Sequence, residues 1–202
     1  MAYVGKPNVA AHVHEQADIT NLTTDIANVT IGQHTIWIPA VAMIPAVTNG
    51  PELNSIETAT NKVLINTMDF STAAEEFVQF GIQMPKSWDR ATLVAQFIWS
   101  HASTATNFGV VWGIEGLSLS DGNVFETAWG SEVVIADIGG STDTAYITSE
   151  TAGITLAGSP AVEDYSMFRI TRVVGNVNDT LGIDARLHGI KLHYTTNTDT
   201  DD

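Results

Sequence analysis

Most of the chain is a succession of short β-prone runs, and this pattern limits the fold more than any other feature. The runs are separated by clusters of Gly, Asn, Asp, Ser and Pro, which are turn formers. Short strands at such spacing are typical of a β-sandwich or a barrel. The expected strands cover residues 62–68, 77–84, 92–99, 108–119, 132–136, 145–148, 154–156, 165–174, 180–184 and 186–195.

The number of runs and the long connections between them favour an all-β, jelly-roll-like antiparallel β-sandwich. An immunoglobulin-like sandwich is the alternative. The chain has no Cys, so the disulfide that marks a true immunoglobulin domain is absent. Residues 71–76 and 125–129 predict one short helical turn each.

The segment 18–36 has a different pattern, with apolar residues at alternating gaps of three and four when Gln33 is included. This is the spacing of the a and d positions in a coiled coil. A lone helix rich in Thr and Asn would not hold in water, so the pattern predicts a short stalk that sister chains complete. The β-branched and Leu residues at these positions favour a coiled coil of three helices over one of two. The predicted oligomerisation residues are Ile19, Leu22, Ile26, Val29 and Ile36.

The same segment also reads as an extended or β-structured arm, because residues 24–31 alternate almost as well as they repeat by heptads. Either form has no core of its own and needs a partner surface. The sequence therefore predicts a homotrimer with an oligomerisation stalk that is either coiled coil or extended.

The other expected parts follow from composition along the chain. Residues 1–17 form an irregular attachment arm, and residues 37–195 form the β-sandwich head. Within the head, residues 37–60 are expected to be a neck, because Pro39 and Pro45 forbid a regular helix or a central strand there. Residues 196–202 are polar and acidic and predict a disordered tail.

The charge balance excludes some classes of partner. The chain has 202 residues, with 23 acidic against 8 basic side chains and a formal net charge of -15. Nucleic acids and anionic membrane surfaces both need Lys and Arg, so neither is an expected partner. The longest apolar run, residues 36–47, is too short to span a bilayer. No secretory signal is evident near Met1, which predicts a soluble protein made in a cytoplasm.

No motif predicts catalysis or a cofactor. The sequence lacks a Gly-x-Ser-x-Gly elbow, a P-loop, a His-Glu-x-x-His site and a dinucleotide fingerprint. Its many carboxylates are expected to be solvated at strand ends and in loops, so the chain is not predicted to be an enzyme. The only spacing with metal-binding potential is His12-x-His14, which in a trimer would bring imidazoles around one axis. A flexible His-containing arm explains it more simply.

Two groups of side chains are candidates for surface or structural roles. Trp99 and Trp112 lie in apolar runs and are expected in the core, whereas Trp88 and Trp129 lie in loops and are candidates for surface contact, where an indole can stack on a sugar. A network of ion pairs that fixes a strand junction is expected from Arg169, Asp179, Asp184 and Arg186.

Several segments together resemble a known group of proteins. Residues 168–169, 178–181 and 184–190, with 60–63, 84–88 and 106–113, are similar to small domains of predicted tailed-bacteriophage structural proteins. The match covers residues 37–195. The resemblance implies a virion component, typically the trimeric β-sandwich head of a fibre or spike, and it carries over no catalytic residue.

The sequence thus predicts a phage virion surface protein, assembled in the host cytoplasm. Its arm would attach it to other virion proteins, and its heads would contact host surface polysaccharide with the avidity of several weak sites. A capsid decoration protein is one alternative. A free carbohydrate-binding lectin or a glycan-active enzyme is another.

Overall fold

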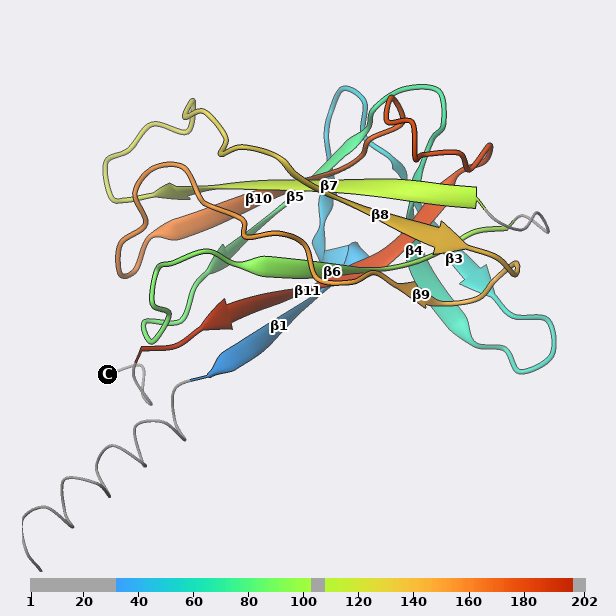
Figure 1. Ribbon diagram of the computed structural model, residues 1–202, viewed down its shortest axis with the longest axis horizontal. Coiled ribbons are helices and arrows are strands. Elements are labelled where there is room, and N and C mark those ends of the chain that lie inside the picture. Colours follow the sequence, from blue (N-terminus) through green and yellow to red (C-terminus); the bar gives the residue numbers. More distant parts are fainter. Residues whose placement is uncertain (1–31, 103–107, 198–202) are drawn as a thin grey trace, which may run out of the picture.

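A computed structural model describes residues 32–102 and 108–197, and within them the chain is a sandwich of two β-sheets (Figure 1). The elements are β1 (Gln33–Pro39), η1 (Ala40–Ala42), β2 (Ile44–Pro45), β3 (Glu52–Glu57), β4 (Leu64–Phe70), β5 (Phe77–Gln83), β6 (Val94–Ser100), β7 (Phe108–Leu119), β8 (Val133–Gly139), β9 (Tyr146–Ile147), β10 (Tyr165–Arg172) and β11 (Ala185–Thr195).

Every pair of neighbouring strands is antiparallel in these two sheets. One sheet has the order β3-β4-β11-β6-β9, and β1 pairs with residues 189–195 of β11, beyond the residues 185–187 that pair with β4. The other sheet has the order β2-β5-β10-β7-β8. Figure 1 shows β1, β11 and β6 running side by side, with β7 and β10 in the other layer. The all-β antiparallel sandwich expected from the sequence is confirmed.

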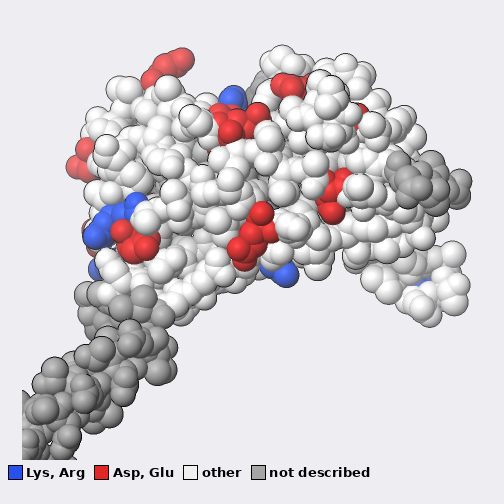
Figure 2. Space-filling view, in the orientation of Figure 1, with Lys and Arg blue, Asp and Glu red and all other residues white. Residues whose placement is uncertain are grey.

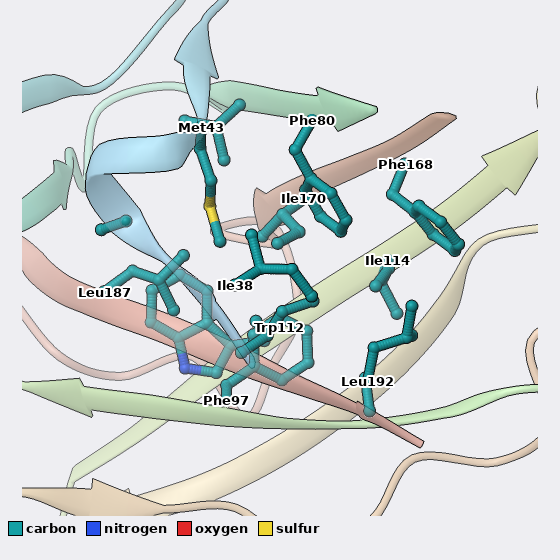
Figure 3. Packing of buried hydrophobic residues seen from close by; sticks show 14 of the residues in the cluster. Ile38, Met43, Phe80, Phe97, Trp112, Ile114, Phe168, Ile170, Leu187 and Leu192 are labelled. Atoms are coloured by element: carbon teal, nitrogen blue, oxygen red, sulfur yellow. The ribbon is translucent and has the colours of Figure 1, made fainter. Parts of the chain in front are cut away.

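The core lies between the sheets and is rich in aromatic rings (Figure 3). The Trp112 ring stacks on Phe97 at a centroid distance of 5.6 Å and meets the Phe70 ring edge-on at 5.2 Å. Phe80 and Phe168 stack at 5.0 Å. Such pairs stabilise a core beyond the area that they bury. The expected burial of Trp112 is confirmed.

Most expected strands exist, with small shifts of their ends. The run 108–119 coincides with β7. Residues 180–184 form no strand; they lie in an irregular segment whose Thr180 and Leu181 amides donate to the Gly109 carbonyl. The expected helical turns at 71–76 and 125–129 are also absent, since both segments are turns or irregular loops.

The last residues of the expected stalk are a strand and not a coiled coil. Gln33 and Ile36 lie in β1, where Ile36 opposes Leu192 of the same chain and packs, half-buried, on its own core. Pairing with β11 satisfies the backbone of β1 and buries Ile36 and Ile38 on one face. The prediction that Ile36 faces a sister chain is therefore wrong. The other predicted stalk residues, Ile19, Leu22, Ile26 and Val29, lie outside the described residues.

Residues 37–60 supply strands to both sheets. They contain the end of β1, η1, β2 and β3. Pro39 ends β1 and Pro45 lies in the edge strand β2, both positions that a sheet tolerates for proline. The arm 1–17 and residues 198–202 of the expected tail lie outside the described residues. No helix in the described ranges is long and apolar enough to cross a membrane.

Candidate functional site

The outer face of the sheet that contains β5, β10 and β7 is hollowed. Two adjoining hollows of about 300 and 660 Å³ share Gln79 of β5 and Met167 of β10. We call them together the outer groove. Its two ends are bounded by residues 44–47 on one side and by the loop 125–129 on the other. Concave sites of this size are typical of small-ligand binding.

An exposed tyrosine forms part of the floor at one end of the outer groove. Tyr165 begins β10, is 44% exposed, and its ring lies over Gly81 of the neighbouring strand. A Cβ at position 81 would collide with that ring. A glycine inside a strand weakens the strand and often marks a place where another group must approach closely. Gly81 thus lets the Tyr165 ring lie along the sheet.

Trp129 forms the other end of the groove and is held by a charged side chain. The Arg169 guanidinium lies 5.2 Å from the centroid of the Trp129 ring and 4.8 Å from that of Phe77. Arg169 is also paired with the buried carboxylate of Glu115 on β7. The Gly130 amide donates to the Gly116 carbonyl at 3.0 Å, which fixes the loop next to Trp129. Cation–π contacts and an ion pair therefore fix the indole in place.

Between these two aromatic rings lie groups suited to a ligand with apolar faces and polar edges. Gln79 offers amide donors and an amide acceptor, and Met167 offers a flexible apolar surface. Phe125, which is 78% exposed, lines the wall beside Trp129. A pyranose ring has this mixed character, with C–H groups on its faces and hydroxyls around its edge.

The electrostatics near the groove disfavour an anion. Burial, together with the nearby Glu115 and Glu75 carboxylates, raises the pKa of Glu132, and Arg169 only partly opposes this. Arg169, the cation beside Trp129, is already paired with Glu115. The side of the molecule in Figure 2 has more acidic than basic groups, in keeping with the formal net charge of -15 of the whole chain. A neutral ligand fits these surroundings best.

Asp164 fixes the turn that precedes Tyr165. Burial alone would raise the pKa of Asp164. Hydrogen bonds from the Ala161 amide and from the Ser120 and Ser118 hydroxyls lower the pKa by more than burial raises it, so the pKa lies below the usual value of 3.8. The Ala161 amide and the Ser118 hydroxyl reach Asp164 Oδ2 at 2.9 and 3.0 Å.

This environment predicts a pH-dependent contribution to stability. The lowered pKa of Asp164 stabilises the fold above pH 3.8 and ceases to do so as the pH falls through the folded-state pKa. We expect Asp164→Asn to lower the free energy of unfolding at pH 7, and the difference from the wild type to shrink toward zero as the pH falls below 3.8. Urea titrations at a series of pH values measure this. A difference that is constant with pH would contradict it.

The two predicted surface tryptophans behave differently. Trp129 is half-buried and lines the outer groove. Trp88 is 2% exposed and belongs to the core, so its predicted surface role is wrong. The reason is two backbone hydrogen bonds with residues 195–197, at and just after the end of β11. The Asn197 amide donates to the Ser87 carbonyl and the Asp89 amide to the Thr195 carbonyl, both at 2.9 Å. These bonds tie the loop to the end of β11 and turn the indole inward.

The expected ion-pair network is resolved into separate pairs with other partners. Asp179 pairs with Arg172 at 2.7 Å, Arg169 with Glu115, and Arg186 with Asp143 at 2.8 Å. Asp184 is exposed, directly precedes β11 and joins none of these pairs. The prediction of one network is wrong because β10 directs alternate side chains to opposite faces: Arg169 points outward and Arg172 inward.

The predicted metal ligands His12 and His14 lie outside the described residues. Within residues 32–102 and 108–197, no three His, Asp or Glu side chains lie close enough together to hold a metal ion.

Sequence reasoning missed most of the groove. It named Trp129 but not Tyr165, Gln79 or Phe125, because nothing in the sequence shows that β10 and β5 are neighbours. The available signal was Gly81 between Phe80 and Ile82, a glycine inside an otherwise apolar strand.

Comparison with known proteins yields structural likeness only. No protein-family model and no curated protein matches the chain. Among solved structures, a family 11 carbohydrate-binding module from Clostridium thermocellum, in complex with a β-1,3-1,4-mixed-linked tetrasaccharide, is 11% identical, with a TM-score of 0.40 over 78% of this chain and 94% of the module. The CBM22-2 xylan-binding domain from Paenibacillus barcinonensis is 10% identical, with a TM-score of 0.43 over 76% of this chain and 91% of that domain.

A protein of unknown function from Shewanella oneidensis is 13% identical and covers more of the chain, 94%, with a TM-score of 0.33. At these scores the likenesses carry no argument about what this chain binds. The candidate site rests on its own geometry.

Proposed function

We propose that this β-sandwich is a non-catalytic carbohydrate-binding module, and that the outer groove takes a neutral glycan. The observation that supports the proposal is the pair of aromatic side chains, Tyr165 and Trp129, placed at the two ends of one hollowed sheet face. Gln79 lies between them to bond hydroxyl groups. Aromatic rings cover the apolar faces of sugar rings, and amides match their edges.

Binding of soluble polysaccharides tests the proposal. The full chain is run in native gels containing neutral glucans, xylans, mannans or galactans, and hits are followed with the matching oligosaccharides by calorimetry. We expect retardation by at least one neutral polymer and none by polygalacturonate, since the chain carries a net charge of -15. Failure of every neutral polymer to retard the chain would overturn the proposal. Release of new reducing ends would instead show an enzyme.

A glycine substitution tests how the groove is built. Gly81→Ala places a methyl group where the Tyr165 ring lies, and the end of that flexible side chain must move. We expect the free energy of unfolding to change by no more than about 0.5 kcal/mol. The affinity for the neutral glycan should fall about fivefold to tenfold, because the aromatic floor is displaced. Calorimetry and urea unfolding measure the two effects. Undiminished affinity would remove Tyr165 from the site.

We further propose that this module is part of a phage particle. The proposal is supported only by the resemblance of residues 37–195 to tailed-phage structural proteins. A trimeric fibre or spike head would present several weak glycan sites to a host surface at once. Light scattering on the full chain tests the homotrimer, and a monomer would contradict it. Immunogold labelling of the particle separates the fibre or spike from a capsid decoration protein.

A further inference from the structure

The opposite face of the sandwich carries a second hollow, of about 670 Å³. It lies on the outside of the sheet that contains β4, β11 and β6, and no residue of the outer groove lines it. Its apolar lining comes from Trp37, Ile56, Ile65 and Ile98. We call it the rear groove.

The rear groove repeats the construction of the outer groove. Trp37 of β1 is 47% exposed, and its ring lies over Gly189 of β11, where a Cβ would collide with it. Gly189 lies where the register between β11 and β6 shifts, with a φ of 155°. In both sheets, then, a glycine inside a strand makes room for a large exposed aromatic ring on the neighbouring strand.

Among the described residues, each carboxylate that lines the rear groove has an ion-pair partner. Asp143 is paired with Arg186 at 2.8 Å, and Glu57 with Lys62 at 3.1 Å. His188 Nε2 and Ser100 Oγ lie 2.9 Å apart and both residues line the hollow. Burial lowers the pKa of His188, opposed by Asp69 and aided by Arg186, so the imidazole is neutral at pH 7. These groups suit a ligand with hydroxyls and no charge.

We propose that the rear groove is a second carbohydrate site, which takes a neutral sugar with its apolar face on Trp37 and its hydroxyls toward His188 and Ser100. This inference rests on the proposed function of the outer groove, since the ligand class is the same. The two sites lie on opposite faces of one sandwich. The module would therefore bind two glycan chains at once and cross-link them.

Indole N–H signals in a ¹⁵N-correlated spectrum test the proposal, because each groove contains one tryptophan of its own. The full chain is titrated with the neutral oligosaccharides selected above. The Trp37 and Trp129 signals are assigned with Trp37→Phe and Trp129→Phe.

The decisive sample is Tyr165→Ala/Trp129→Ala, in which the outer groove is disabled. We expect the Trp37 signal still to shift with sugar there, and Trp37→Ala added to it to abolish the remaining binding. Ile138→Ala, an exposed apolar change on β8 outside both grooves, is the matched control.

The outcomes separate the two proposals. Shifts of Trp129 with an unmoved Trp37 signal would overturn the rear site and leave the outer site standing. An unmoved signal from both tryptophans would overturn both. A Trp37 signal that shifts with protein concentration, and not with sugar, would assign the rear groove to contact between copies of the chain and would also overturn the second site.

Discussion

Replacing Arg172 by Met is expected to lower the free energy of unfolding by about 3–5 kcal/mol, the usual cost of removing one partner of a buried ion pair. Arg172 is 1% exposed. Its Nε and Nη2 donate to the Asp179 carboxylate at 3.0 and 2.7 Å. The guanidinium also donates to the carbonyls of Phe70, Leu181 and Ile183. The substitution leaves a buried carboxylate, the buried carbonyls of Phe70 and Leu181, and the part-buried carbonyl of Ile183 without these donors.

Urea unfolding measures this loss, and a second variant assigns its cause. In Arg172→Met/Asp179→Asn the unpaired charge is gone, so we expect the double variant to be more stable than Arg172→Met alone. The recovery should be incomplete, because the Asp179 carboxylate also accepts from the Val111 amide at 3.0 Å and the carbonyls stay unpaired. A loss below about 1 kcal/mol for Arg172→Met would show that Arg172 does not hold the segment 173–184 onto β7 and β4.

Truncating the two aromatic ends of the outer groove is expected to remove most of that groove's affinity for glycan. Trp129→Ala and Tyr165→Ala should each cost about 2 kcal/mol of binding free energy, or about thirtyfold in Kd. Both side chains are partly exposed, so the fold should persist. Trp129→Ala also removes one ring from Arg169, which keeps Phe77 and Glu115.

Calorimetry with the selected oligosaccharide measures the affinities. Trp129→Phe is the conservative control, since it keeps an aromatic face of smaller area and should restore part of the binding. Phe125→Ala tests the wall and is expected to have a smaller effect, because that ring is mostly exposed. Equal affinity of the wild type and Tyr165→Ala/Trp129→Ala would place the glycan elsewhere. That result would be compatible with the rear groove only if Trp37→Ala then removed the binding.

Local patterns settled much of the architecture. Alternation and turn clusters identified most strands, and the run 108–119 coincides with β7, because a side-chain period of two and Gly or Pro at the ends are local properties. The same local reasoning failed where pairing overrides pattern. Ile36 fits a heptad by spacing, yet β1 joins β11 because a strand edge satisfies the backbone of Gln33–Pro39 and a lone helix would not cover its apolar side.

The sequence by itself determined that this chain is an acidic all-β sandwich without Cys, because charge, Cys content and β-periodicity need no neighbours. Only the tertiary structure decided which aromatic side chains reach the surface. The loop that carries Trp88 is hydrogen-bonded to residues 195–197, and its indole lies in the core. Tyr165 and Trp37 instead lie on the surface, over glycines of strands far away in sequence. Both grooves depend on such contacts between distant strands, and sheet order cannot be read from any one segment.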